Sequence, residues 1–232
     1  MSSPFHFSNF FDMELCPTHA KVFSHTEFVW DVLNPLGEYL QTLPLGVHES
    51  EPDPGAYVID PQLIYIGPGV TIEPGAYIAG PCYLGAGTVV RHGAYLRGNV
   101  ITGENCVLGH ATEVKNSLFL NHACAPHFAY VGDSVLGNNV NLGAGTRLAN
   151  FRLDHQEISV MTGEGSYRSG RRKFGAILGD GSQLGCNSVC NPGSILGKGV
   201  ITLPCTSVSG VVREGCTIRH GVRNKTTAPA EV

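Results

Sequence analysis

The chain has 232 residues, enough for one sizeable core or for a small leader and one domain. Its net charge of −4 argues against a general nucleic-acid surface, and no 18-residue apolar run is present that could span a membrane. The eight cysteines are scattered without a C-x-x-C pair, and the N-terminus lacks the basic and apolar regions of a secretory signal. These features predict a soluble cytoplasmic protein with reduced thiols.

Residues 1–55 form an acidic leader without a repeat, with eight acidic side chains and one basic side chain. The segment from Ser24 to Glu27 has the sequence of a capping box, and several apolar residues follow it. This pattern predicts a helix near residues 25–42. Pro35 should kink that helix or split it in two, and a proline-rich linker should follow it.

From about residue 56 to residue 215, aliphatic residues recur every six positions. The residues of this series include Ile66, Ile72, Ile78, Leu84, Val90, Leu96, Leu108, Val114, Leu120, Leu136, Leu142, Leu148, Leu178, Leu184, Leu196 and Val208. No amphipathic helix repeats at six, whereas a hexapeptide period with glycine and proline turns is typical of a parallel β-helix. Three hexapeptides form one coil of 18 residues. We therefore predict an all-β domain over 56–215, followed by a C-terminal tail over 216–232.

The period is interrupted over residues 150–175 by a polar, glycine-rich stretch. It contains Arg168 and ends in the basic run Arg171, Arg172 and Lys173. A long loop projecting from a regular solenoid is often functional. We predict one long inserted loop here, with a solvated surface loop as the alternative interpretation.

Two cations are placed to stack on one face of the solenoid. Arg97 and Lys115 are 18 residues apart, and neighbouring coils are separated by roughly 4.8 Å. Stacked like charges are tolerated where an anion lies between them. His127 follows 12 residues later, where the six-residue period slips between Leu120 and Leu136. Irregular backbone beside a histidine and two cations favours a functional site over a solvated charged face.

The histidines also permit a zinc site. His122 and His127 are five apart, a spacing similar to that in hexapeptide-repeat carbonic anhydrases. Catalytic zinc needs three convergent ligands and an open position, and the sequence identifies no third ligand. We therefore predict no metal. His92 and His110 are 18 apart and should stack as turn residues.

Four ordered segments carry a family resemblance: 113–117, 126–133, 141–150 and 173–180. In this order they resemble the C-terminal acetyltransferase domain of the bifunctional N-acetylglucosamine-1-phosphate uridyltransferase/glucosamine-1-phosphate acetyltransferases. The resemblance implies a left-handed parallel β-helix, a homotrimer and active sites between subunits. Uridyl transfer is not predicted, because the leader lacks the family's glycine-rich Leu-x-Gly-Gly-x-Gly-x-Arg loop.

The resemblance also implies roles for individual residues. His127 would be the general base, and Asn150 would hold the sugar's acetamido end and help place the thioester carbonyl. The side chains implied in binding the sugar phosphate are Arg97, Lys115, Tyr130, Asn141 and Lys173. Arg91 competes with Arg97, since it carries the family's Arg-x-Gly-Ala wording whereas Arg97 has the spacing to Lys115.

Coenzyme A is the implied second ligand, with acetyl-CoA as co-substrate. The matched positions are Ala144, Cys186 and Pro204, of which the last two are 18 apart and should stack. Cys186 replaces a serine that is common in the family, and Phe151 replaces a frequent tyrosine.

The predicted function is transfer of an acetyl group from acetyl-CoA to the amine of glucosamine 1-phosphate. One alternative keeps this chemistry but uses another amino-sugar phosphate or a nucleotide sugar as acceptor. The other is a β-helix that is non-catalytic or binds zinc. Neither nucleic acid nor a membrane is an expected partner.

Overall fold

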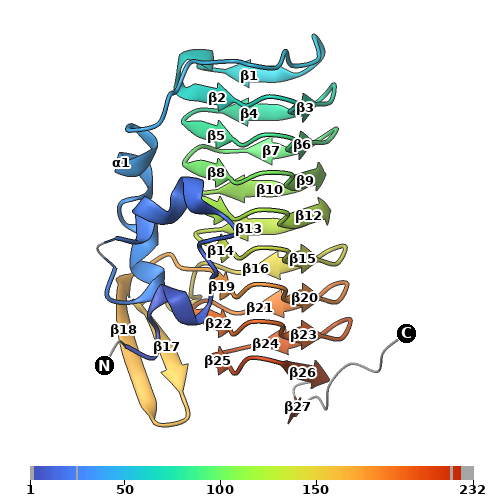
Figure 1. The fold of residues 1–232 in the computed structure, drawn as a ribbon. Coiled ribbons are helices and arrows are strands. Elements are labelled where there is room, and N and C mark those ends of the chain that lie inside the picture. The colour runs from blue at the N-terminus through green and yellow to red at the C-terminus, as the bar shows by residue number, and fades with distance from the viewer. Residues whose placement is uncertain (1–2, 25, 220–221, 226–232) are drawn as a thin grey trace.

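The computed structural model describes residues 3–24, 26–219 and 222–225. Within these residues the chain winds into a parallel β-helix, whose coils stack along one axis and each give one strand to each of three sheets (Figure 1). The predicted all-β solenoid is confirmed. Its left-handed winding remains what the resemblance implies. No helix in the described ranges is long and apolar enough to cross a bilayer.

The first sheet contains β1 (Tyr57–Ile59), β4 (Tyr77–Ala79), β7 (Tyr95–Leu96), β10 (Glu113–Lys115), β13 (Tyr130–Gly132), β16 (Arg147–Leu148), β21 (Val189–Cys190) and β24 (Ser207–Val208). The second contains β2 (Ile64–Ile66), β5 (Cys82–Leu84), β8 (Val100–Thr102), β11 (Ser117–Phe119), β14 (Val135–Leu136), β19 (Ala176–Leu178), β22 (Ser194–Leu196) and β25 (Val211–Val212). The third contains β3 (Thr71–Ile72), β6 (Val89–Val90), β9 (Val107–His110), β12 (Cys124–His127), β15 (Asn141–Leu142), β20 (Gln183–Leu184), β23 (Ile201–Thr202), β26 (Cys216–Arg219) and the antiparallel β27 (Val222–Lys225).

The six-residue series fills the interior of the solenoid, with one exception. Leu84, Leu96 and Leu108 are fully buried in one continuous core. At the next turn Phe119, not Leu120, points into this core, and Leu120 packs outside against the leader. The cause is a shorter coil: Phe119 pairs with Leu136, 17 residues later. The prediction that Leu120 is a core position of the series is therefore wrong.

The solenoid continues beyond residue 215. β26 pairs in parallel with β23, so Cys216 to Arg219 belong to the third sheet and not to a separate tail. Residues 220–221 and 226–232, the remainder of the predicted tail, lie outside the described residues.

The leader contains short helical turns where one helix over 25–42 was predicted. They are η1 (Phe7–Asn9), η2 (Pro17–Phe23), η3 (Val29–Leu33) and α1 (Leu36–Leu40), and a further turn, η4 (Pro61–Leu63), lies in the first coil. Pro35 separates η3 from α1, as expected of a residue without a backbone N–H. Ser24 ends η2 and does not cap the next helix; the actual cap is Asp31, which accepts from the Phe28 N–H at 2.8 Å. Residue 25 lies outside the described residues.

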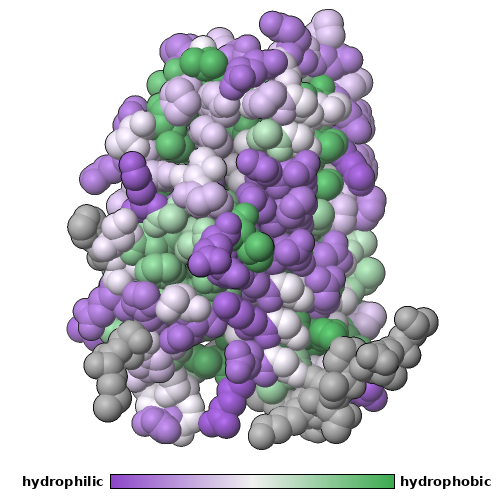
Figure 2. Space-filling view, viewed as in Figure 1, coloured by the Kyte–Doolittle hydropathy of each residue, from purple (hydrophilic) through white to green (hydrophobic). Residues whose placement is uncertain are grey.

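The leader covers the outer face of the second sheet (Figure 1). Its aromatic side chains form a second apolar cluster with outward-pointing residues of five strands, namely Ile101, Leu118, Val135, Ile177 and Ile195. Trp30 and Phe23 are almost completely buried there. On the face seen in Figure 2, hydrophobic residues gather over the leader at the left, and hydrophilic residues predominate toward the middle. The leader thus hides an apolar sheet face from water.

The expected loop over 150–175 is largely an antiparallel hairpin. It consists of β17 (Ile158–Thr162) and β18 (Gly165–Arg171), and it lies beside the leader in Figure 1. Ile158 and Val160 are buried in the leader's apolar cluster, because alternate residues of β17 face inward. The interpretation as a purely solvated loop is therefore wrong.

Candidate active site

The predicted site residues occupy two opposite edges of the first sheet. His127 ends β12 at the corner where the chain leaves the third sheet. Lys115 ends β10 and Asp133 follows β13, at the corner where the chain enters the second sheet. The intervening strand β13 has three residues, a span of about 10 Å. No hydrogen bond joins the two edges directly through His127 among the residues that the structure describes.

His127 lies in one column with the three residues matched to coenzyme A binding. The backbone N–H of Gly145 donates to the His127 carbonyl at 3.0 Å, so Ala144 lies one coil below His127. The strand registers then carry the column on to Cys186 and Pro204. Asn187 N–H donates to the Ala144 carbonyl, and Cys205 N–H donates to the Cys186 carbonyl, both at 2.8 Å. The exposed histidine therefore stands at one end of a ridge of small side chains.

Arg97 and Lys115 are neighbours on the first sheet, but each has a carboxylate partner. The Arg97 guanidinium binds Glu113 at 2.6 Å, and the Lys115 ammonium binds Asp133 at 3.0 Å. The hydrogen bond from Glu113 raises the pKa of Arg97. The two stacked cations therefore do not require an external anion, and that part of the sequence argument is wrong. Arg97 remains about half exposed and accessible to a ligand.

Arg91 lies elsewhere. It follows β6 in the third sheet, where its N–H donates to the Leu108 carbonyl. Its neighbour in the chain, His92, belongs to the corner that also holds His127. Only Arg97, of these two arginines, lies on the sheet of Lys115.

Asp133 is the centre of the second edge, and sequence reasoning gave it no role. It is almost fully buried and accepts a hydrogen bond from Asn116 Nδ2 at 2.8 Å. Asn150 Nδ2 donates to its Oδ2, the same oxygen that binds Lys115. Arg171 of the hairpin approaches its Oδ1 at 3.8 Å. The available signal was the Gly132-Asp133 pair that closes the 126–133 motif.

The remaining predicted residues are spread around this edge. Tyr130 Oη donates to Asn150 Oδ1 at 3.4 Å, and burial is the main reason why its pKa is raised. Lys173 forms an isolated antiparallel bridge with Phe151 at the base of the hairpin, and its side chain is exposed. Asn141 lies on β15 in the third sheet, half-buried and in register with Cys124 and Gln183. Asn141 is thus on the side of His127 and not on that of Asn150.

The histidines of the third sheet form a ladder and not a metal cage. The rings of His92 and His110 stack with centroids 5.6 Å apart, as predicted. Nδ1 of His110 lies 2.9 Å from the His92 carbonyl, and Nδ1 of His92 lies 2.7 Å from the Pro74 carbonyl. Within the described ranges, no group of three or more His, Cys, Asp or Glu side chains is arranged to hold a metal ion.

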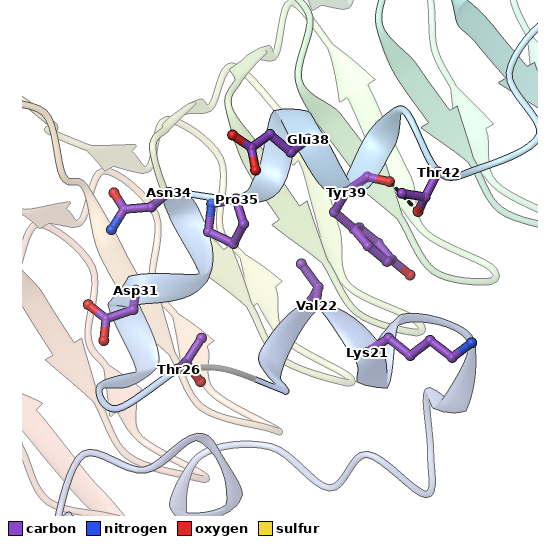
Figure 3. A pocket seen from close by; sticks show the side chains of 9 residues that line it. All are labelled: Lys21, Val22, Thr26, Asp31, Asn34, Pro35, Glu38, Tyr39 and Thr42. Carbon is purple, nitrogen blue, oxygen red and sulfur yellow. Dashed lines mark hydrogen bonds between the residues drawn. The ribbon is translucent and has the colours of Figure 1, made fainter.

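A surface hollow of about 550 Å³ lies within the leader, between η2 and the segment from η3 to α1 (Figure 3). Its wall includes Lys21, Asp31, Asn34 and Tyr39. No predicted site residue lines it. Asn34 nevertheless connects this region with the site, since its side-chain oxygen accepts a hydrogen bond from Arg171.

Comparison with known proteins supports the resemblance drawn from the sequence. Residues 78–166 match the model of the GMPPB C-terminal domain. A bifunctional sugar-1-phosphate nucleotidylyltransferase/acetyltransferase of Sulfurisphaera tokodaii is 42% identical over 81 residues, which are 35% of this chain and 20% of that protein. The bifunctional protein GlmU of Methanococcus aeolicus is 37% identical over 82 residues, again 35% and 20% of the two chains. The matched part of this chain thus spans about a fifth of these relatives' length. The β-helix is related to the acetyltransferase domain of this group.

A shorter relative and two solved structures were also found. The putative uncharacterized acetyltransferase YaiX of Escherichia coli is 42% identical over 67 residues, 29% of either chain. AntD, an N-acyltransferase from Bacillus cereus, matches with a TM-score of 0.35 at 14% identity, covering 83% of this chain and 88% of that one. The Arabidopsis UDP-N-acetylglucosamine acyltransferase matches with a TM-score of 0.36 at 12% identity, covering 73% and 69%.

Proposed function

We propose that this protein transfers the acetyl group of acetyl-CoA to the amine of an amino-sugar phosphate, with glucosamine 1-phosphate as the acceptor. The observation that carries the proposal is the column formed by His127, Ala144, Cys186 and Pro204. It supplies an exposed imidazole at one end of a ridge on which a pantetheine arm could lie without meeting a large side chain. The names of the matched relatives, which include acetyltransferases of sugar phosphates, support the same reaction.

His127 is the base in the proposed reaction. An alkylammonium has no lone pair, so one proton must leave it before the nitrogen can attack the thioester carbonyl. Unperturbed imidazole titrates near neutrality and can accept this proton. The nitrogen–carbon bond then forms while the carbon–sulfur bond breaks, and the coenzyme A thiolate leaves with the protonated histidine available to neutralise it.

The sugar phosphate is bound by the cations of the other edge in this proposal. Lys115 and Arg97 are paired but not fully buried, and Lys173 is exposed, so each can exchange or share its partner with a phosphate. Since His127 and these cations occupy opposite edges of the first sheet, we further propose a homotrimer. In it, one copy contributes the His127 edge and the next copy contributes the Asn150 edge to a single site.

The test is release of free thiol from acetyl-CoA by the purified chain, with glucosamine 1-phosphate, glucosamine 6-phosphate and UDP-glucosamine supplied separately. Turnover with the 1-phosphate supports the whole proposal. Turnover with another amine alone keeps the reaction and replaces the acceptor. No thiol release with any of the three amines would contradict the proposed function.

One observation favours a different acceptor as the second candidate. The hairpin and the leader both reach the Asn150 edge, because Arg171 contacts Asp133 and Asn34. These segments add polar groups beyond those of the bare solenoid, and a nucleotide sugar would have more atoms to contact them. The UDP-glucosamine reaction decides between the two acceptors.

A further inference from the structure

Asp133 faces donors on every side. Lys115 and Asn150 bind its Oδ2, and Asn116 and Arg171 face its Oδ1. The carboxylate lies at the start of a turn, with φ of 48°, which points its side chain back along the edge where β10, β13 and β16 end. A buried carboxylate with an ammonium and a guanidinium close by is held in its charged form, in which it can only accept hydrogen bonds.

This charge determines which way the Asn150 amide points. An acceptor-only neighbour can bind the NH2 end of the amide but not the oxygen end. Asn150 Nδ2 therefore faces Asp133, and Oδ1 faces away, toward the Tyr130 hydroxyl at 3.4 Å. Because Asn150 is itself only 8% exposed, packing leaves few other orientations for its side chain. Its oxygen is the end presented to the half-buried Tyr130.

We propose that Asp133 is a positioning residue, which fixes Asn150 as a hydrogen-bond acceptor for the N–H of the substrate amine. This inference rests on the proposed function. It changes the role implied by the resemblance, in which Asn150 places the thioester carbonyl as a donor. An amide oxygen facing the site binds an ammonium or amine, and it repels the carbonyl oxygen of a thioester. The site would therefore select an amine acceptor over an alcohol mainly through the charged form of that amine.

Arg171 and Lys115 help to hold Asp133 in place. Arg171 is largely buried, and burial lowers the pKa of its guanidinium, which nevertheless keeps Asp133 and Asn34 as partners. Its Nε donates to the Lys173 carbonyl at 3.1 Å. The hairpin base, the leader and the solenoid edge therefore meet at one carboxylate, which explains why a surface-like segment of the sequence ends in a buried cation.

The experiment exchanges the two side chains. In Asp133→Asn the new amide can offer its NH2 to Asn150, so the Asn150 amide is free to turn its own NH2 toward Tyr130. In the double variant Asp133→Asn/Asn150→Asp the charge is retained, and an acceptor-only group again faces Tyr130. We expect a fall in kcat of about 100-fold for the single variant, since misplacement of a contacting group by about 1 Å has this effect. The double variant should recover at least tenfold of it.

Asp180→Asn is the matched control. Asp180 is another shielded carboxylate, and it accepts from the Asp12 and Asn138 N–H groups at 2.7 Å, away from the site. At a temperature where all variants are folded, its kcat should stay within about twofold of wild type, because it touches no site residue. An unchanged kcat in Asp133→Asn, or a double variant no better than the single one, would overturn the inference.

A second measurement does not depend on turnover. The side-chain NH2 signals of Asn150 can be observed by NMR in protein labelled with ¹⁵N-asparagine, and assigned by their loss in Asn150→Asp. In wild type, one proton of the pair should exchange slowly with water because it is bonded to Asp133, and this protection should be lost in Asp133→Asn. Identical signals in both proteins would overturn the orientation. If wild type transfers no acetyl group, the proposed function fails while these spectra still decide the orientation of Asn150.

Discussion

At the scale of single residues, His127 combines exposure with a fixed backbone. Its carbonyl is bonded to the next coil, and its strand is paired with β9 through His110. The ring therefore has a defined origin on the solenoid but is not enclosed by protein. That combination suits a group that must meet two ligands and carry a proton between them.

His127→Ala should lower kcat for acetyl transfer by about 10²- to 10⁴-fold, the usual contribution of a positioned base. Folding should be unaffected because the side chain is exposed. The measurement is steady-state thiol release with thermal denaturation of the same samples. His92→Ala, which removes an exposed ring at the same corner two coils away, serves as the control. Equal losses in the two variants would contradict a specific role for His127.

His19 is a buried histidine outside the site. It has no exposed surface, Nε2 lies 3.3 Å from the Thr102 carbonyl, and Nδ1 lies 3.3 Å from the Tyr39 hydroxyl. Burial lowers the pKa of this imidazole to about 4, because the charged ring would lose its hydration. The neutral ring thus connects the leader to the second sheet.

The stability of the protein should therefore fall in mild acid. Between pH 6.5 and about pH 4 the unfolded chain binds a proton at His19 that the folded chain does not, so stability rises with pH across this window and is lost as pH falls. The pKa difference corresponds to about 3 kcal/mol. Urea unfolding at several pH values should show a shallower pH dependence for His19→Gln than for wild type. Equal slopes would contradict this assignment.

At the scale of elements, the leader is attached by an apolar face and by a few polar contacts. Asp180 accepts from the Asp12 N–H, and Asn121 Nδ2 donates to the Leu15 carbonyl at 2.6 Å. Phe23 is the centre of its aromatic packing, with ring centroids 5.1 Å from Phe7 and 5.5 Å from Phe11. The solenoid core, in contrast, contains no leader residue.

Phe23→Ala should weaken the attachment of the leader by about 3–5 kcal/mol and leave the coils formed. Trp30 is the single tryptophan, so its fluorescence reports on the leader, while circular dichroism reports on the strands. In a urea titration the fluorescence transition should move to lower urea and the dichroism transition should not. Leu153→Ala, a truncation of a side chain that is 98% exposed, should move neither. Joint movement of both signals would show one cooperative unit instead.

At the scale of the whole molecule, the two edges of the first sheet set the expected assembly. Three copies would have three times the 24.7 kDa mass of one chain, which analytical ultracentrifugation can measure. The leader covers the second sheet, so the contacts between copies must use the first or third sheet or the coil corners.

Mixed assemblies can show whether one site uses two copies. His127→Ala and Asn150→Ala should each be inactive alone, but coexpression should restore about a quarter of the sites in a ring of three. The measurement is the specific activity of the coexpressed protein against separately purified variants mixed just before assay. Activity that stays at the level of the single variants would place both residues of a working site in one chain.

The short range of the β-helix repeat explains how much of the fold was predictable. A residue such as Leu96 points inward because of turns within six residues of it, so the period alone indicates its burial. At Phe119 and Leu120 two adjacent apolar residues compete for the inward position, and only pairing with Leu136 selects Phe119. The hairpin was likewise hidden, because the apolar residues Ile158 and Val160 are buried by the distant leader.

The sequence by itself determined the β-helix, the column below His127 and the candidate residues, since all follow from spacing along a regular coil. Only the tertiary structure decided which charges meet. Asp133 joins partners 17 and 38 positions away, and Arg171 reaches Asn34 across 137 positions, between segments that share no period. Such contacts depend on where the leader and the hairpin pack against the coils, and burial of their apolar side chains, not local spacing, fixes that position.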